Sequence, residues 1–279
     1  MTLRRRVAGA RVGEHRAFRR GASLEFAEHR PYTPGDDPRR IDWNAYARLG
    51  ELVVRLFIAE EDVTLRLLVD ASASMGFGAP AKLDVARRLA AGLGYLALRG
   101  SERVALLVGD GAPGAPALRG RGKVHALLAS LDALRATGGA RLDAAADRVL
   151  ARRAQGPGVA VLFGDLLDEG ATVRAAARLA AARHEVVVVH TLSREDLDPA
   201  PDDASALVDC ETGASLDLVL DDEARAAYRA ELARFLDEAA RALRRAGARY
   251  VQAFPGRDAL DVLTEVLTGR AGRAGPWSS

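Results

Sequence analysis

The stretch "TLRLLVDASASMGFG", residues 64–78, decides the fold of this chain. Its first half is a short apolar run without helical spacing, which is typical of a strand buried on both faces. Its second half places Asp70, Ser72 and Ser74 at alternate positions directly after that strand. Alternate residues of an extended segment point the same way. We therefore expect one carboxylate and two hydroxyls to converge at the end of the strand.

Strand and helix patterns alternate along the rest of the chain. The pattern predicts strands at 64–70, 103–110, 158–165, 185–192 and 249–254, and helices at 81–100, 123–137, 142–154, 171–184, 222–247 and 258–269. Residues 205–220 are expected to form a hairpin that turns at Glu211–Gly213. Apolar strands that alternate with helices are typical of a parallel sheet covered on both faces. We predict a doubly wound, mostly parallel α/β domain.

The N-terminal part differs in composition from this domain. Residues 1–50 hold eleven arginines against six acidic residues, in a chain whose net charge is only +2. We expect a basic arm over residues 1–22 and an added β and turn element over residues 23–61, whose last part, 51–62, is a strand. The prolines of this element exclude a long helix. The α/β domain then spans 62–269, and 270–279 form a loose tail.

Composition limits the classes of protein that this chain can belong to. Cys210 is the single cysteine, which excludes an internal disulfide and a cysteine-based metal site. No apolar run reaches the roughly 18 residues of a membrane helix, and the basic N-terminus lacks the apolar core of a signal peptide. We expect a cytoplasmic protein without a transmembrane segment. The basic arm lacks interleaved aromatic residues, so we expect no nucleic-acid partner.

The cluster after the first buried strand has the chemistry of a metal site. Carboxylate and hydroxyl oxygens suit a hard cation, Mg²⁺ above all or Mn²⁺. Ligands of doubly wound sheets bind beyond the carboxyl ends of the strands, where Asp165 is also expected because it ends the strand 158–165. The alternative is that such residues only cap helices, a role open to Ser74 or Asp84.

The sequence also resembles a known family. "DASASM", residues 70–75, is similar to the Asp-x-Ser-x-Ser signature of the metal-ion-dependent adhesion site in von Willebrand factor A domains. The longer segment 25–78, followed by "ERVALLV" at 102–108, resembles the bacterial domain of unknown function 58 (DUF58) family, and the resemblance extends over about residues 13–195. It implies a von Willebrand A-like fold with an added N-terminal β element. It further implies a MoxR-type AAA+ ATPase as partner.

The resemblance assigns the candidate metal ligands to three loops. Asp70, Ser72 and Ser74 match the first loop of the adhesion site, and Asp165 matches the third. The second loop of the family supplies a threonine, where this chain has Ala140, which offers no side-chain donor. Thr137 replaces it only if the loop is rearranged, and a water molecule is the other substitute. Two interpretations stay open: a site that holds Mg²⁺ or Mn²⁺, and a site that has lost its metal.

A second cluster of candidates lies in "RPYTPGDDPRRIDW", residues 30–43. Its charged residues can form a bidentate ion-pair network around two aromatic residues. The segment is either a rigid turn that packs the N-terminal element onto the sheet or a surface that docks a partner. The candidate docking residues are Arg30, Tyr32, Asp36, Asp37, Arg39, Arg40, Asp42 and Trp43.

We predict a non-enzymatic protein-binding module. On the resemblance, it is an assembly or chaperone cofactor that acts with a MoxR-type ATPase through the Mg²⁺ site. The chain contains no Gly-x-Ser-x-Gly and no Walker A motif, and Ser72 stands where a haloacid-dehalogenase phosphatase needs a second aspartate. The alternatives are a structural scaffold with a dead metal site and, third, a metal-dependent phosphohydrolase that uses Asp70 or Asp165.

Overall fold

The computed structural model describes residues 24–59, 63–109, 117–139, 142–152, 156–199, 205–208, 215–218 and 221–270. The expected basic arm 1–22, Ala140, the hairpin turn Glu211–Gly213 and the tail from 271 onward lie outside these ranges. The described residues fall into two units, 24–59 and 63–270.

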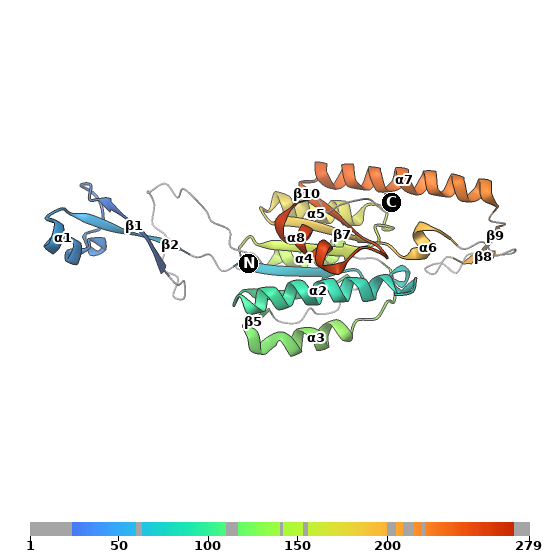
Figure 1. Ribbon diagram of the computed structural model, residues 1–279, viewed down its shortest axis with the longest axis horizontal. Helices are drawn as coiled ribbons and strands as arrows, with labels where there is room; N and C mark the ends of the chain where they lie inside the picture. Colours follow the sequence, from blue (N-terminus) through green and yellow to red (C-terminus); the bar gives the residue numbers. More distant parts are fainter. Residues whose placement is uncertain are drawn as a thin grey trace. The chain divides into compact units, whose positions relative to one another are not determined.

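The larger unit is built on a six-stranded sheet (Figure 1). Its strands are β3 (Thr64–Val69), β4 (Arg103–Val108), β5 (Leu118–Arg119), β6 (Val159–Gly164), β7 (Glu185–Thr191) and β10 (Ala248–Ala253). Their spatial order is β10-β7-β6-β3-β4-β5, and every pairing is parallel except that of the edge strand β5. Counted along the chain, this is the doubly wound order 3-2-1-4-5-6. The predicted fold class is confirmed, although β5 was not foreseen.

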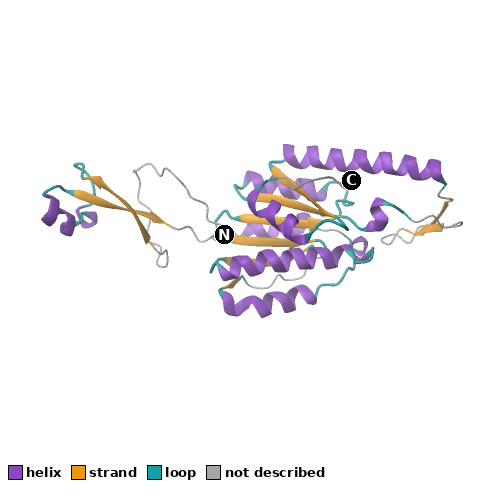
Figure 2. Ribbon diagram, viewed as in Figure 1, coloured by secondary structure: helices purple, strands orange, loops and turns teal. Residues whose placement is uncertain are grey.

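Helices cover both faces of this sheet (Figure 2). One layer contains α2 (Lys82–Arg99), α3 (Val124–Asp132) and α8 (Ala259–Thr268); the other contains α4 (Leu142–Ala151), α5 (Ala171–Ala181) and α7 (Asp222–Arg245). Successive residues of β3 serve the two layers, since Leu67 packs in the first core and Leu68 in the second. All six residues of β3 are therefore buried, which is why its sequence lacks polar alternation.

One predicted helix ends earlier than its pattern suggested. The expectation of a helix over 123–137 is wrong beyond α3, because residues 134–139 leave the helix and turn toward the end of β3. There the amide of Thr137 donates to Ala71 O (2.8 Å) and the amide of Ala73 donates to Gly138 O (2.9 Å). The side chain of Arg87 also donates to Leu134 O. Tertiary hydrogen bonds thus replace the last helical turn.

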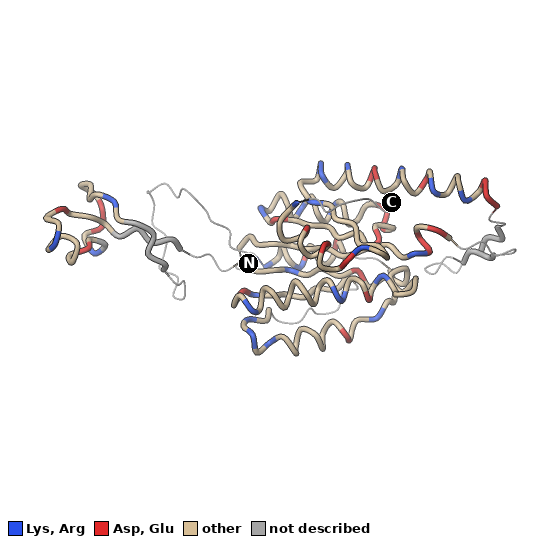
Figure 3. Tube along the Cα trace, in the orientation of Figure 1, with Lys and Arg blue, Asp and Glu red and all other residues tan. Residues whose placement is uncertain are grey.

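The C-terminal part carries a long surface helix. Along α7, 24 residues long, only Leu232, Leu236, Ala240 and Leu243 are buried, and charged residues follow one another along its length (Figure 3). The strands β8 (Ser205–Val208) and β9 (Ser215–Leu218) pair antiparallel, which confirms the expected hairpin. Neither α7 nor any other helix in the described ranges is apolar over the length needed to cross a membrane.

The smaller unit pairs β1 (Leu24–Pro31) with β2 (Val53–Ala59) in an antiparallel ribbon. Between them lie the single-turn 3-10 helix η1 (Pro38–Arg40) and α1 (Trp43–Leu49). The strand β1 and the helix α1 were missed because turn-forming residues dominate the segment. The signals for α1 are nevertheless present: Asp42 accepts from the amides of Asn44 and Ala45, and Gly50 ends the helix with φ +72°.

Candidate metal site at the carboxyl edge of the sheet

Asp70 and Asp165 lie at the ends of neighbouring strands. Asp70 follows β3 and Asp165 follows β6, and the amide of Asp70 donates to Phe163 O (2.9 Å). The helix after β3 is in one layer and the helix after β6 is in the other. The strand order therefore reverses between these two strands, and their carboxyl ends border the crevice where doubly wound proteins bind ligands.

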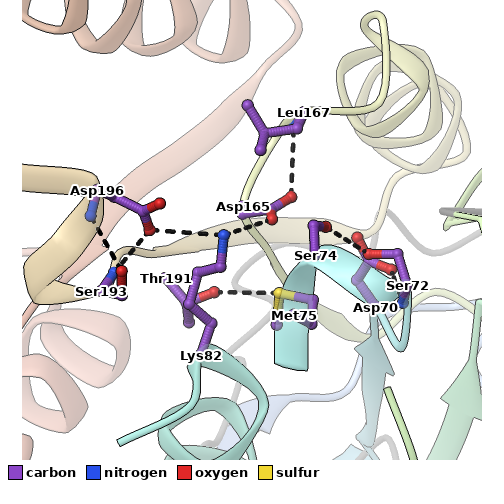
Figure 4. A network of polar contacts seen from close by, with 10 residues as sticks. All are labelled: Asp70, Ser72, Ser74, Met75, Lys82, Asp165, Leu167, Thr191, Ser193 and Asp196. Carbon is purple, nitrogen blue, oxygen red and sulfur yellow. Dashed lines mark hydrogen bonds and ion pairs between the residues drawn. The ribbon is translucent and has the colours of Figure 1, made fainter. Parts of the chain in front are cut away.

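The first loop, residues 70–78, turns its polar side chains toward one another (Figure 4). Asp70 Oδ1 accepts from the amide of Ser72 (2.9 Å), and Ser72 Oγ lies 3.0 Å from Ser74 Oγ. All three residues are buried, and the 3-10 turn η2 (Ala73–Gly76) brings Ser74 back beside Ser72. One carboxylate and two hydroxyls thus meet where the sequence predicted them to converge.

Helix capping does not account for these hydroxyls. Ala81 occupies the N-cap position of α2 without a side-chain hydrogen bond, and Ser72 occupies that of η2 without one. Asp84 lies in the first turn of α2 and pairs with Arg87 (2.6 Å). The alternative in which Ser74 or Asp84 serves as a helix cap is therefore wrong. The Ser72 and Ser74 hydroxyls face each other instead.

Asp70 is a buried acid without a cationic partner among the described residues. Burial raises the pKa of Asp70 to about 6, and the charges of Asp165 and Asp168 add to the rise against the hydrogen bonds from Ser72. A buried carboxylate is costly unless it is paired or bound to a metal. A cation beside Asp70 would remove that cost.

Lys82 is a residue of this site that the sequence analysis missed. Its Nζ lies 2.8 Å from Asp165 Oδ2 and 3.5 Å from Asp196 Oδ2 (Figure 4). The Lys82 and Asp165 side chains are 2% and 3% exposed, so the pair is inaccessible to water. A signal existed: a lysine in the first turn of a helix opposes the helix dipole, and the chain contains one other lysine, Lys123.

The second partner of Lys82 comes from the single-turn helix α6 (Arg194–Leu197), which was also missed. Asp196 Oδ2 accepts from the amide of Ser193 (2.8 Å), and Ser193 Oγ accepts from the amide of Asp196 (3.0 Å). Gly78 makes the approach of the first loop possible, because its φ is +95° and a Cβ there would collide with Ser193 Cβ. The first loop, third loop and α6 therefore surround one lysine.

The second loop contributes only main-chain contacts among its described residues. Thr137 and Gly138 pair with the first loop through their backbone, and Thr137 is exposed. Ala140 lies outside the described residues. Within the described ranges, no three histidine, cysteine, aspartate or glutamate side chains group around a possible metal position. The donors that fit a hard cation are thus Asp70 and the two hydroxyls, whereas Asp165 is paired with Lys82.

Exposed apolar side chains flank this polar centre. Phe77, at the end of the first loop, is 53% exposed, and Leu167, two residues after Asp165, is 62% exposed. The amide of Leu167 donates to Asp165 Oδ1 (3.3 Å), which fixes that residue to the third loop. The loops that hold Asp70 and Asp165 thus each expose one large apolar side chain.

The candidate docking residues of the smaller unit mostly hold their own loop together. Arg30 contacts Asp36 through one pair of atoms (2.5 Å), and the same Asp36 accepts from the amide of Thr33 (3.0 Å). Asp37 and Asp42 cap η1 and α1. Among the described side chains, Arg30 and Asp36 thus pair through single atoms rather than bidentately, and Trp43 is 60% exposed. Tyr32 is half-buried, Arg39 is exposed, and the Arg40 side chain lies outside the described residues.

The chain is similar in sequence or in structure to several known proteins. An uncharacterized protein of Mycobacterium tuberculosis is 32% identical over 279 residues, which cover 98% of this chain and 88% of that protein, and one of Mycobacterium bovis matches equally. Among solved structures, the conserved hypothetical protein BatB of Bacteroides thetaiotaomicron is similar over 74% of this chain and 98% of its own (TM-score 0.46, 16% identity). The SpRpn10 VWA domain is similar over 76% and 99% (TM-score 0.38, 14% identity).

The family model described as "Protein of unknown function DUF58" matches residues 28–238. That match covers most of both units. The strand order 3-2-1-4-5-6 with an antiparallel edge strand agrees with the von Willebrand A-like fold that the sequence resemblance implied. This chain belongs to the DUF58 family and has a von Willebrand A-like α/β domain.

Proposed function

We propose that this chain is a non-catalytic protein-binding module that contacts its partner through the loops around Asp70. The observation that carries the proposal is the convergence of Asp70, Ser72 and Ser74, with the two hydroxyls 3.0 Å apart and capping no helix. Each hydroxyl has one donor and two acceptor lone pairs, so the contact between the two leaves hydrogen-bonding or metal-binding capacity for a ligand. The exposed side chains of Phe77 and Leu167 on the same loops give the partner an apolar surface.

Mg²⁺ is the cation that this donor set fits best, with Mn²⁺ as the alternative. Asp70, Ser72 and Ser74 would hold it, and Asp165 would join them when Lys82 gives up its contact. Mg²⁺ takes six oxygen ligands and keeps several waters. A bound ion of this kind offers an acidic side chain of a partner one coordination position, which makes binding depend on both the ion and the acid.

The family resemblance directs us to a MoxR-type AAA+ ATPase as the partner, in the cytoplasm. A second contact would come from the smaller unit, where Trp43 and Arg39 are exposed and Arg30, Asp36, Asp37 and Asp42 stabilise the loop that presents them. In this proposal the chain acts as an assembly or chaperone cofactor and turns over no substrate.

The test measures binding to the purified ATPase with Mg²⁺ or with EDTA. Asp70→Ala should abolish the Mg²⁺-dependent part of the affinity, because it removes the one carboxylate of the first loop. Asp132→Ala, which removes an exposed acid of α3, is the matched control and should leave the affinity unchanged. Calorimetry with Mg²⁺ alone separates loss of the ion from loss of the partner.

Two other results would assign a different function. Binding that survives Asp70→Ala and EDTA but is lost when residues 24–59 are removed would identify a scaffold with a dead metal site. Mg²⁺-dependent release of phosphate from a panel of phosphate esters, abolished by Asp70→Ala or Asp165→Ala, would identify a phosphohydrolase.

A further inference from the structure

Lys82 has a position that neither helix stability nor surface solubility explains. It is the first residue of α2, where the positive end of the helix dipole repels a cation. Its side chain is 2% exposed, and a buried ammonium is stable only when it is paired. The side chain therefore depends on its two carboxylate partners, Asp165 and Asp196.

The two partners differ in their surroundings. Asp165 belongs to the candidate metal site and its side chain is 3% exposed, whereas the side chain of Asp196 is 21% exposed and lies on α6. Lys82 Nζ is closer to Asp165, at 2.8 Å, than to Asp196, at 3.5 Å. The ammonium of Lys82 thus contacts two carboxylates. A metal ion in the site would need Asp165 as a ligand but would not need Asp196.

We propose that Lys82 is an internal competitor for the divalent cation, which holds Asp165 when the site has no cation and moves to Asp196 when one binds. The inference rests on the cation site of the proposed function. Lys82 suits the role because an ammonium is a compact charge on a flexible stem, with three donors that can be redistributed by small rotations. Asp196 keeps that ammonium paired after the exchange, so no buried charge is left alone.

The proposal makes Lys82 and Asp196 opposite determinants of cation affinity. Lys82→Met removes the competitor and frees Asp165 as a ligand, so it should tighten Mg²⁺ binding at least about tenfold. Asp196→Asn removes the alternative partner and ties Lys82 to Asp165, so it should weaken Mg²⁺ binding. An asparagine at 196 still offers an oxygen to the amide of Ser193, which preserves the start of α6.

Charge-matched variants distinguish competition by Lys82 from a general change in the electrostatic potential at the site. Arg88→Met removes a positive charge from the same helix α2 at an exposed residue. Glu195→Gln removes a negative charge from α6 next to Asp196, at a residue that forms no ion pair with Lys82. Both controls should leave the Mg²⁺ dissociation constant within about twofold of the unaltered chain.

The experiment is calorimetric titration of the full chain and these variants with Mg²⁺, repeated with Mn²⁺ by electron paramagnetic resonance. Tighter binding by Lys82→Met and weaker binding by Asp196→Asn, with both controls unchanged, supports the proposal. An unchanged or weaker affinity of Lys82→Met overturns it. If Lys82→Met does not fold, Asp196→Asn decides, and an affinity equal to that of Glu195→Gln overturns the proposal.

The two proposals fail in distinguishable ways. Mg²⁺ binding by Lys82→Met but not by the unaltered chain would refute both the native cation site and the exchange of Lys82 onto Asp196, because Lys82 would then block the site permanently. Asp70-dependent binding by the unaltered chain that Lys82→Met does not tighten would support the site and refute the competition. No binding by any variant would refute both.

Discussion

Lys82 Nζ lies 2.8 Å from Asp165 Oδ2, although 83 positions separate the two residues and both side chains are buried. The contact joins the start of α2 to the loop after β6, and so crosses the point where the strand order reverses. A charge pair in this place connects the two sides of the crevice. It also determines which acids of the crevice remain available to a ligand.

Breaking the contact between Lys82 and Asp165 should lower the free energy of unfolding when no metal ion is present. With EDTA present, Lys82→Met should lower the free energy of unfolding by about 3–5 kcal/mol, because the buried carboxylate of Asp165 loses its partner. Asp165→Asn should cost less, because Asp196 still pairs with Lys82. The double variant should cost less than the sum of the two by at least about 1 kcal/mol, because no charge of the pair then remains. Urea denaturation of the four proteins measures the cycle. Strictly additive losses would show that the two charges do not interact.

Gly78→Ala should destabilise the larger unit by more than backbone strain alone. A positive φ costs a non-glycine residue about 1–3 kcal/mol, and the new Cβ would in addition collide with Ser193 Cβ. Gly120→Ala is the control, since its φ is also positive, at +83°, and nothing lies within 4 Å of the added carbon. Chemical denaturation compares the two. Equal losses would mean that the first loop and α6 are not in close contact.

Acid should lower the free energy of unfolding through His184. This residue directly precedes β7 and so lies at the end of the sheet opposite the candidate site. Burial, together with the charge of Arg66, lowers the pKa of His184 below its ordinary value, and its Nδ1 accepts from the amide of Gly158 (3.1 Å). The unfolded chain therefore takes up the proton first as the pH falls. The stability contributed by the neutral ring is complete above about pH 6.5 and is lost below it. The midpoint temperature of thermal unfolding should fall more steeply between pH 7.5 and pH 5.5 in the unaltered chain than in His184→Gln. Parallel curves for the two proteins would contradict this.

The sequence was sufficient for the fold class but not for every element. The strands of the sheet are apolar on both faces, as Leu67 and Leu68 show, and the main helices have regular apolar spacing, so their alternation could be recognised. Elements of two to four residues, such as β5 and α6, are too short to show a period. The end of α3 was misplaced because tertiary hydrogen bonds at Thr137 and Gly138 determine it.

The candidate site also has one part that the sequence predicts and one part that it does not. Asp70, Ser72 and Ser74 are neighbours in the sequence, so local geometry alone predicts their convergence. Lys82 and Asp196 reach the site from a helix start and from a single-turn helix, and only the packed structure brings them within reach of Asp165. Sequence spacing says nothing about such contacts. The sequence shows only that Lys82, one of two lysines in the chain, stands at an unfavourable position at the start of a helix.

The apolar rim of the site should contribute to partner binding independently of the metal. Phe77→Ala and Leu167→Ala should each weaken binding of the MoxR-type ATPase about tenfold, since burying such a side chain contributes about 1.5–3 kcal/mol. Both residues are more than half exposed, so the free energy of unfolding should change by less than about 0.5 kcal/mol. Leu128→Ala, which truncates an exposed leucine of α3, is the matched control and should leave the affinity unchanged. Affinities measured with EDTA should fall by the same factor as those with Mg²⁺. Unchanged affinity in both variants would place the partner elsewhere on the molecule.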